Sequence, residues 1–458
     1  MYQDHFSLSA SSPASAAPPN MPAPLRVGLL GLGTVGGGTL AVLLRNADLI
    51  AARAGRRIEV RMVAVRNLER ARSVLGAHAA SLHLTDDAQV LVHSPEVDVV
   101  VDVMGGTTLA RTLVLQAIAA GKHVVTANKA LLAEHGSEIF AAAQARGVVV
   151  AYEGAVAVSI PIIKTLREGL TANRIEWVAG IINGTSNFIL SAMRERGLGF
   201  AAALTEAQAL GYAEADPAFD VQGTDAAHKL SLLAANAFGT LPQYAEVQAE
   251  GIEDLQAADV DFAARLGYCV KLLGIAKRRG QGLELRVHPT LLPAGHLLAQ
   301  VHGSMNAVMV QSDAAGTTLF YGAGAGAEQT GSAVIADLVD LARSASLLPH
   351  QRVPALGFAR GVQAGLPVVG ADEVESAFYV RLDLSRPELA APRVLQQLAA
   401  DGVRVERMAQ YPHPADPELQ CLVLLTAPVR LRTLRPALQT VEGWPEVMGF
   451  ASLLRLGF

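Results

Sequence analysis

The glycine-rich string GLLGLGTVGGG constrains the fold of this chain more than any other feature. It places Gly31, Gly33 and Gly36 in a GxGxxG spacing, directly after the apolar run LRVGLL and directly before a helical pattern. There the first glycine permits a tight turn, the second lets a pyrophosphate approach the main chain, and the third lets the helix pack on the strand. An ordinary glycine-rich turn is the alternative. The context favours dinucleotide binding, with Thr34 and Val35 beside the cofactor at the helix N-terminus.

The first part of the chain alternates short β-branched runs with longer helical stretches, and one helical stretch after LRVGLL reaches about Arg53. Runs that are apolar throughout belong in a parallel sheet whose two faces are covered by helices. We therefore predict an α/β fold that begins with a doubly wound, Rossmann-type NAD(P)-binding domain over residues 25–152. Residues 1–24, rich in Ser, Ala and Pro, are predicted to be a disordered tail. A transit peptide would favour arginine and avoid Asp4.

The pattern changes after Tyr152. A helix opened by Pro161 and a strand RIEWVAGII lead into alanine-rich helices and loops that continue to about Gly316. We predict an α+β domain over 153–348, within which 317–345 packs back on the first domain or closes the second. A linker over 349–373 then leads to a β-α-β-β-α-β series over 374–458, the order of a ferredoxin-like domain.

The end of the second predicted strand bears on the choice of dinucleotide. Folds that bind NAD commonly carry a carboxylate there for the ribose 2′-hydroxyl, but IEVRMVAVRN ends in Arg66 and Asn67. An arginine at this point suits a 2′-phosphate. We expect NADP, and NAD remains the alternative because a surface arginine would look the same in the sequence.

Composition excludes several classes of partner. Only 17% of the residues are charged and the formal net charge is −5, without a long basic run, so we expect no nucleic-acid partner. Charges interrupt every apolar stretch before the roughly 18 residues that a membrane-spanning helix needs, so we expect no membrane insertion. The chain has 2 cysteines. We expect Cys269 to pack in an apolar helix and Cys421 in a strand, in a cytoplasmic protein.

The segment GYAEADPAFDVQGTDAAHKLSLLAANAFG gathers Glu214, Asp220, Asp225 and Lys229 in an otherwise apolar protein. Asp225 and Lys229 lie four residues apart on one face of a helix predicted over about 224–239, and an exposed ion pair is the plainest interpretation. The alternative is a site for an amino acid. Carboxylates bind its ammonium, and a partly desolvated lysine can move a proton during hydride transfer. His228 is expected on the surface of this helix.

A second lysine competes for the role of proton carrier. Lys129 lies in VVTANKALL, where a predicted parallel strand ends and a helix begins. Nucleotide-binding sheets bind their ligands at this carboxyl edge. The alternative is a solvent-facing lysine in the first turn of the helix.

Five blocks in order resemble homoserine dehydrogenases: TANKALL, YEGAVAVSIPII, AGIINGTSNFIL, GYAEADPAFDVQGTDAAHKL and FYGAGAGAEQTGSAV. The resemblance covers nearly the whole chain after the N-terminal tail and implies that 153–348 is the catalytic and dimerisation domain. It implies NAD(P)-dependent interconversion of L-aspartate 4-semialdehyde and L-homoserine, in the route to threonine and methionine. The blocks depart from the family in reading EADP where EPDP is frequent.

The resemblance also implies roles for individual residues. Lys229 would donate or accept the proton beside Asp225, and Lys129 matches a family lysine near the nicotinamide that is sometimes given this role. The residues that would bind substrate are Glu214, Asp220, Asp225, Gly184 and Thr185. The residues that would join the glycine turn and Arg66 in binding the cofactor are Lys129, Gly211 and Gly326.

The loop after Tyr152 resembles the monovalent-cation site of the family. The ligands of an ion such as sodium would be main-chain carbonyls at Val156, Val158 and Ile160, together with Glu153. Val158 and Ser159 stand where many members carry glycines. A main-chain ligand tolerates this change of side chain.

The C-terminal series resembles an ACT domain, whose first loop, here DLSRPELAAP, often binds an amino-acid effector. Feedback by threonine is one hypothesis, and a structural or dimerising role is the other. We expect a homodimer or a homotetramer. A phosphorylating semialdehyde dehydrogenase is disfavoured because neither cysteine suits a nucleophile. A non-catalytic NADP-binding sensor would leave the charged segment unexplained.

Overall fold

The computed structural model describes residues 22–359 and 366–458. Most of the predicted tail, residues 1–21, and residues 360–365 of the predicted linker lie outside the described residues. Two compact units emerge from the contacts within the chain. The first contains residues up to 175, 228–245 and 311–359, and the second contains 176–227, 246–310 and 366–458.

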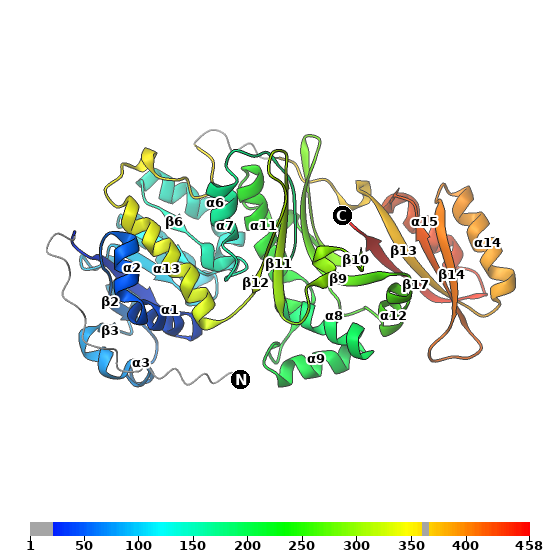
Figure 1. Cartoon of the computed structure of the whole chain (residues 1–458), viewed down its shortest axis with the longest axis horizontal. Helices are drawn as coiled ribbons and strands as arrows, with labels where there is room; N and C mark the ends of the chain where they lie inside the picture. The colour runs from blue at the N-terminus through cyan, green and yellow to red at the C-terminus, as the bar shows by residue number, and fades with distance from the viewer. Residues whose placement is uncertain (1–21, 360–365) are drawn as a thin grey trace. The chain divides into compact units, whose positions relative to one another are not determined.

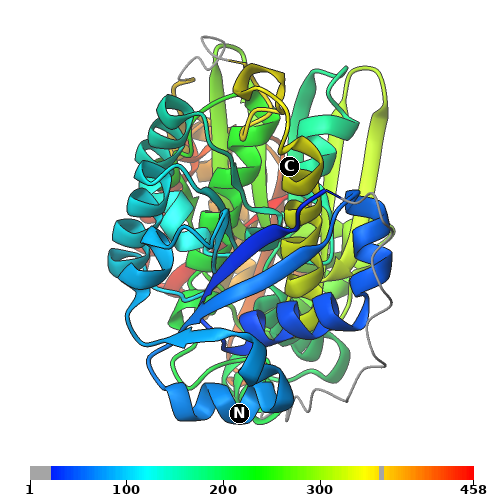
Figure 2. The ribbon, with the colours of Figure 1, turned by 90° about the vertical axis from the view of Figure 1, so that its left-hand side faces the viewer.

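The first unit is built on a parallel sheet in the order β3-β2-β1-β4-β5-β6 (Figures 1 and 2). The strands are β1 Leu25–Leu30, β2 Ile58–Ala64, β3 His83–Thr85, β4 Val99–Asp102, β5 His123–Thr126 and β6 Val150–Ala151. This order reverses direction beside β1, which is the property of a doubly wound dinucleotide-binding sheet. The predicted Rossmann-type sheet is confirmed.

Helices connect these strands: α1 Thr34–Arg45, α2 Ala47–Ala54, α3 Leu68–Leu75, α4 Ala88–His93, α5 Thr108–Ala119 and α6 Lys129–Arg146. The helix expected to run unbroken to about Arg53 is instead α1 and α2, which meet at Asn46 with a bend of 83°. Among the described residues, no single helix has both the length and the apolar character to cross a membrane. Only α1 and α2 taken together pass that test, on length and composition alone.

Helix α13, Ala327–Ser344, follows β12, Gly316–Ala323, and packs in the core of the first unit. Its residues Val334 and Leu338 belong to the same buried cluster as Val27 and Leu29 of β1. Figures 1 and 2 show α13 in yellow beside α1 and α2 in blue. The approach of α13 to α1 requires a glycine, because a Cβ at Gly38 would lie 2.3 Å from the main-chain oxygen of Ala327.

The second unit contains a mixed sheet whose strands run in the order β11-β7-β9-β10-β17-β13-β15-β14. Its N-terminal elements are β7 Ile175–Ile181, α8 Gly184–Arg196, α9 Phe200–Ala209, α10 Ala218–Val221, α12 Ala257–Arg265, β9 Tyr268–Arg279, β10 Gly282–Pro293 and β11 Met305–Ser312. Helix α11, Thr224–Phe238, begins in this unit and continues into the first.

The expectation of helices and loops up to Gly316 is confirmed as far as α12 and is wrong beyond it. The region contains the long antiparallel hairpin of β9 and β10, and Cys269 lies in β9 instead of a helix. Nearly every residue from Cys269 to Leu292 is buried, apart from the turn. A strand buried on both faces loses its alternating pattern, so its apolar run cannot be told from a buried helix by periodicity.

The C-terminal residues form the predicted β-α-β-β-α-β order. The elements are β13 Glu375–Leu384, α14 Pro387–Ala400, β14 Val405–Pro412, β15 Gln420–Thr426, α15 Leu431–Glu442 and β17 Val447–Leu456. They share one sheet with the rest of the second unit, because β17 pairs in parallel with β10 through Thr290 with Arg455 and Leu291 with Leu456. The two helices cover their own buried apolar cluster.

Candidate active site

The glycine turn of the first unit has the geometry that its spacing predicts. Gly31 adopts a φ of +104°, which favours glycine, and a Cβ there would lie 3.0 Å from the oxygen of Val103. A Cβ at Gly36 would lie 2.3 Å from the oxygen of Gly31, so only glycine lets α1 start this close to the turn. Nothing approaches Gly33. Thr34 and Val35 open α1, whose free N–H groups can face an anion.

Other predicted cofactor residues of the first unit lie at the neighbouring ends of strands and helices. The N–H of Gly31 donates to the carbonyl of Ala64 at 3.0 Å, so the end of β2 adjoins the glycine turn. Arg66 follows β2 with an exposed side chain. Gly326 precedes α13 with a φ of +141°, and its carbonyl accepts from the N–H of Thr330 at 3.0 Å.

Lys129 is the first residue of α6 and is half-buried. A chain of hydrogen bonds fixes the turn before it. Thr126 Oγ1 donates to Asp102 Oδ2 at 3.0 Å and accepts from the N–H of Asn128 at 2.9 Å. Asn128 caps the helix by accepting from the N–H of Leu131 at 3.1 Å. Burial raises the pKa of Asp102. Position alone predicted Lys129, and the hydrogen-bonded residues before it were not foreseen.

Asn183 joins the two aspartates of the charged segment in the second unit. Its Nδ2 donates to Asp220 Oδ1 and to Asp225 Oδ2, both at 2.8 Å. Its Oδ1 caps α8 by accepting from the N–H of Ser186 at 2.8 Å. No pattern in the sequence pointed to Asn183 as a site residue. An asparagine between the apolar run AGII and a helix start is a recognisable cap, but nothing in the sequence shows where its amide donates.

The remaining predicted substrate and cofactor residues of the second unit surround this turn. A Cβ at Gly184 would lie 2.6 Å from the oxygen of Ser304, which excludes a larger residue. Thr185 Oγ1 donates to the carbonyl of Tyr212 at 2.6 Å, next to Gly211, which adopts a φ of +77°. The segment that contains Gly211 is therefore fastened to the start of α8.

Glu214 differs from the two aspartates. Its side chain is exposed, and its carboxylate makes no hydrogen bond or ion pair with any residue in 22–359 or 366–458. Its main-chain oxygen accepts from Gln208 Nε2 at 3.1 Å. No hydrogen bond joins Glu214 to Asp220 or Asp225 in the structure.

Helix α11 carries Asp225 and Lys229 one turn apart, and both are buried, with 3% and 7% of their surface exposed. An exposed ion pair therefore does not describe them. The expectation that His228 lies on the helix surface was wrong. It is 2% exposed, with its ring 4.2 Å from that of Tyr244 and its Nε2 3.8 Å from Glu134 Oε1. Every face of this part of α11 is covered, which a helix with one apolar stripe would not predict.

The predicted cation loop follows β6 in the first unit. Glu153 Oε1 and Oε2 accept from the N–H groups of Ile163 and Lys164 at 3.0 and 2.8 Å, so the carboxylate caps the short helix α7, Ile162–Lys164. Burial raises the pKa of Glu153 to about 7. Asp337 of α13 accepts from the N–H of Glu153 at 2.8 Å, and burial together with Glu153 raises the pKa of Asp337 to about 8.

The carbonyls of this loop suit a hard cation. Val156 is fully buried, and its carbonyl accepts no hydrogen bond from any residue that the structure describes. Ala157 adopts a φ of +52°, unusual for a residue with a side chain, and so turns the chain between Val156 and Val158. The carbonyl of Ile160 accepts from the N–H of Ile162 at 2.7 Å. A buried carbonyl without a donor is a ligand that a cation would satisfy.

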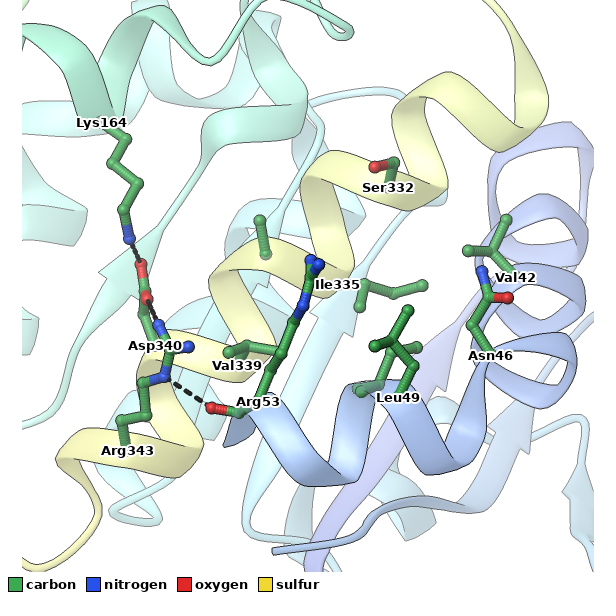
Figure 3. A pocket seen from close by; sticks show the side chains of 12 residues that line it. Val42, Asn46, Leu49, Arg53, Lys164, Ser332, Ile335, Val339, Asp340 and Arg343 are labelled. Atoms are coloured by element: carbon green, nitrogen blue, oxygen red, sulfur yellow. Dashed lines mark hydrogen bonds and ion pairs between the residues drawn. The ribbon is translucent and has the colours of Figure 1, made fainter. Parts of the chain in front are cut away.

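Next to this loop, a 310 Å³ pocket lies along α13 between α1–α2 and Lys164 (Figure 3). Lys164 forms an ion pair with Asp340, and Arg343 Nε donates to the carbonyl of Arg53 at 2.9 Å. Figure 3 shows Lys164 and Arg343 pointing toward Asp340 from its two sides. None of the predicted catalytic or substrate residues lines this pocket.

Comparison with known proteins defines the class and then the family. Residues 31–153 match the family model "Homoserine dehydrogenase, NAD binding domain", and with the glycine turn they define an oxidoreductase that uses a nicotinamide cofactor. Residues 161–339 match the model "Homoserine dehydrogenase". The chain belongs to the homoserine dehydrogenase family, whose members act on a CH–OH group.

The relatives cover nearly the whole chain. A homoserine dehydrogenase from Pseudomonas aeruginosa is 50% identical over 93% of this chain and 97% of its own length. The crystal structure of a homoserine dehydrogenase from Thiobacillus denitrificans is 52% identical, with a TM-score of 0.90 over 96% of this chain and 99% of that one. A hyperthermophilic archaeal homoserine dehydrogenase in complex with NADPH is 25% identical, with a TM-score of 0.58 over 69% of this chain and 97% of that one.

Proposed function

We propose that this chain interconverts L-aspartate 4-semialdehyde and L-homoserine with a nicotinamide cofactor, in the route to threonine and methionine. The observation that carries the proposal is the contact of Asn183 with both Asp220 and Asp225, one helical turn before Lys229. Two carboxylates gathered at one amide suit the ammonium of an amino acid. A buried lysine on the same helix suits the oxygen that gains or loses a proton.

Each residue then has a defined part in the reaction. Asp220 and Asp225, together with Glu214, bind the ammonium of the substrate, while Asn183 holds the two aspartates and caps the turn that contains Gly184 and Thr185. Lys229 takes the hydroxyl proton as homoserine is oxidised and returns it to the carbonyl oxygen in reduction. The bound nicotinamide accepts or supplies the hydride. Lys129, at the carboxyl edge of the parallel sheet, is the alternative proton carrier.

The experiment measures NADP reduction with homoserine for the wild type, Lys229→Ala and Lys129→Ala, with NADPH binding followed separately by fluorescence. We expect Lys229→Ala to lower kcat by about 10³-fold or more with NADPH binding unchanged. If Lys129→Ala shows this loss and Lys229→Ala does not, the two roles are exchanged. Wild-type protein that binds NADPH without turning over homoserine would favour the sensor and exclude the dehydrogenase proposal.

We infer that NADP is the preferred dinucleotide. Arg66 is exposed just after β2, where a 2′-phosphate would lie, and no carboxylate occupies the end of that strand. The archaeal relative in complex with NADPH is consistent with this choice. Arg66→Ala should raise the KM for NADP about tenfold and leave that for NAD nearly unchanged.

We propose that a monovalent cation such as sodium binds the carbonyls of Glu153, Val156, Val158 and Ile160. The buried carbonyl of Val156 supports it, and the cation would supply a fixed positive charge that holds this loop. The carboxylate of Glu153 stays with the N–H groups of α7 and contributes no ligand. Thermal unfolding in sodium and in tetramethylammonium chloride of equal ionic strength should differ if the site binds sodium.

We propose that residues 374–458 are an ACT domain that binds threonine at its first loop, in a homodimer or a homotetramer. The order β17-β13-β15-β14 with helices on one face supports the fold. A structural role is favoured by the pairing of β17 with β10, which makes truncation before residue 374 a poor test because it would expose β10. Arg386→Ala, in the exposed loop after β13, should abolish inhibition by threonine if the loop binds it.

A further inference from the structure

A cavity of 750 Å³ in the first unit lies between α6 and the segment 349–359 that follows α13. Its walls are largely apolar, and they come from three parts of the chain: Phe140 and Ala141 on α6, Leu241 after α11, and Val353 and Phe358 on the segment. None of the residues assigned above to cofactor, substrate or cation lines it. This volume and lining are typical of small-molecule sites, which combine apolar walls with a few polar groups.

The charge of the lining restricts what could bind. Among the described residues, 22–359 and 366–458, Arg352 is the only charged residue of the lining apart from the imidazole of His350, and none of them places a carboxylate in the cavity. Arg352 Nε donates to the carbonyl of Leu347 and Nη1 to that of Gly147, both at 3.1 Å. These bonds hold the guanidinium in place without neutralising it. Arg352 makes no ion pair with any residue in the described ranges. A guanidinium facing apolar walls favours an anion with an apolar body.

The wall of the cavity is held from behind by buried hydrogen bonds. The carbonyl of Ala355 accepts from Tyr152 Oη at 3.2 Å, and Tyr152 Oη accepts from Asn236 Nδ2 at 2.7 Å. Tyr152 is fully buried, and its ring lies 5.5 Å from that of Phe140. The segment 349–359 is therefore fastened to α11 and to α6, so the cavity has fixed walls on both sides.

We propose that this cavity binds a small monoanion with an aromatic or branched aliphatic body, its carboxylate paired with Arg352 and its apolar part between Phe140 and Phe358. The guanidinium donors that remain after Leu347 and Gly147 are satisfied bind the carboxylate. The ligand needs no group that donates to a carboxylate, because the part of the lining that the structure describes has no carboxylate. This site is separate from dinucleotide and substrate binding.

Calorimetric titration of the full-length protein with phenylacetate tests whether the cavity prefers a negatively charged ligand. Phenylacetamide, which is similar in shape and uncharged, is the control. Both are titrated with saturating NADPH and homoserine present, so that the proposed active site is filled. We expect phenylacetate to bind at least about tenfold more tightly than phenylacetamide. Equal affinity for the two compounds, or no saturable binding of phenylacetate at millimolar concentration, would overturn the proposal.

Two variants with matched controls locate the binding. Arg352→Gln should remove the preference for the carboxylate, and Ala141→Phe, on the exposed side of α6, should fill the cavity and weaken both compounds about tenfold. The controls are Arg343→Gln, which also removes an arginine bonded to a main-chain carbonyl, and Ala145→Phe, on α6 outside the cavity. If each control changes the affinities as much as its variant does, the site lies elsewhere. The same conclusion follows if Arg352→Gln still binds phenylacetate more tightly than phenylacetamide. Unchanged dehydrogenase activity shows that each variant has folded.

Discussion

Two carboxylate clusters of the second unit, one fully buried and one partly buried, are held in different ways. Asp259 of α12, with no exposed surface, accepts from Tyr379 Oη and Arg381 Nε, both at 2.8 Å, and from Ser452 Oγ at 2.9 Å. These donors come from β13 and β17 of the C-terminal strands. The cluster therefore fastens α12 to the C-terminal strands through a guanidinium that is shared between Asp259 and Asp383.

The cluster around Asn183 uses a neutral amide instead. One side chain donates to Asp220 and to Asp225, and it brings no charge to the two carboxylates that it gathers. Carboxylates held close together favour a cation beside them, and in the proposed reaction Lys229 and the substrate ammonium are such cations. The comparison teaches that the cluster around Asp259 includes a guanidinium, whereas Asn183 contributes hydrogen bonds and no charge to the two carboxylates that it joins.

The largest expected effect is a loss of catalytic activity on substitution in the cluster around Asn183. Asp225→Asn should lower kcat/KM for homoserine by about 10³-fold, because the substrate ammonium loses a charged partner in a buried site. The unfolding temperature should change little. The matched control is Asp261→Asn, an exposed acid of α12 paired with Arg265. Steady-state kinetics check the prediction, and a loss of less than about fivefold would remove Asp225 from the substrate site.

Stability should separate the clusters in the opposite direction. Asp259→Ala leaves Arg381 buried with one fewer carboxylate, and should lower the free energy of unfolding by about 3–5 kcal/mol. Denaturant titration measures this loss. The activity per folded molecule should stay within about twofold of the wild type. An Asp259→Ala protein of normal stability would contradict the structural interpretation of this cluster.

A third carboxylate pair, Glu153 and Asp337 in the first unit, extends the comparison to pH. Burial raises the pKa of Glu153 to about 7 and that of Asp337 to about 8, so the folded state holds protons that the unfolded state releases at lower pH. Their contribution to stability is complete below about pH 4 and is progressively lost as the pH rises to about 8. Asp337→Asn should flatten this dependence, measured as unfolding free energy against pH. An unchanged slope would show that these groups are ionised in the folded protein.

The smallest effect concerns Asn183 itself. Asn183→Ala removes a helix cap and the shared donor, and should cost about 1 kcal/mol of stability while raising the KM for homoserine about tenfold. The control is Asn67→Ala, which removes a comparable cap from α3 far along the sequence. If the two substitutions had equal effects on the KM for homoserine, Asn183 would act only as a helix cap.

The sequence predicted correctly those elements whose residue pattern is required by the structure itself. The glycine turn was predictable because Gly31 and Gly36 are required by main-chain geometry, and the parallel strands because they are apolar throughout. The hairpin of β9 and β10 was missed because burial on both faces removes the alternation. His228 was misplaced for the same reason, since α11 is covered on every side.

The residues of the candidate site also fall into those that the sequence could predict and those that it could not. Asp225 and Lys229 could be selected because charge is rare in this chain and their spacing follows the helical repeat. Asn183 could not be linked to them, because its contacts join residues about forty positions apart and depend on the fold. Sequence spacing indicates that two residues lie close together only when both are on one helix, as Asp225 and Lys229 are.

That single helix has a mechanical consequence. Asp225 and Lys229 are carried by α11, which begins in one unit and continues into the other. Their separation is set by one turn of hydrogen-bonded backbone, because a single helix carries both residues. A single alanine inserted between them would swing Lys229 about 100° around the helix axis. The substrate anchor and the proton carrier would then point in different directions, although every original side chain would still be present.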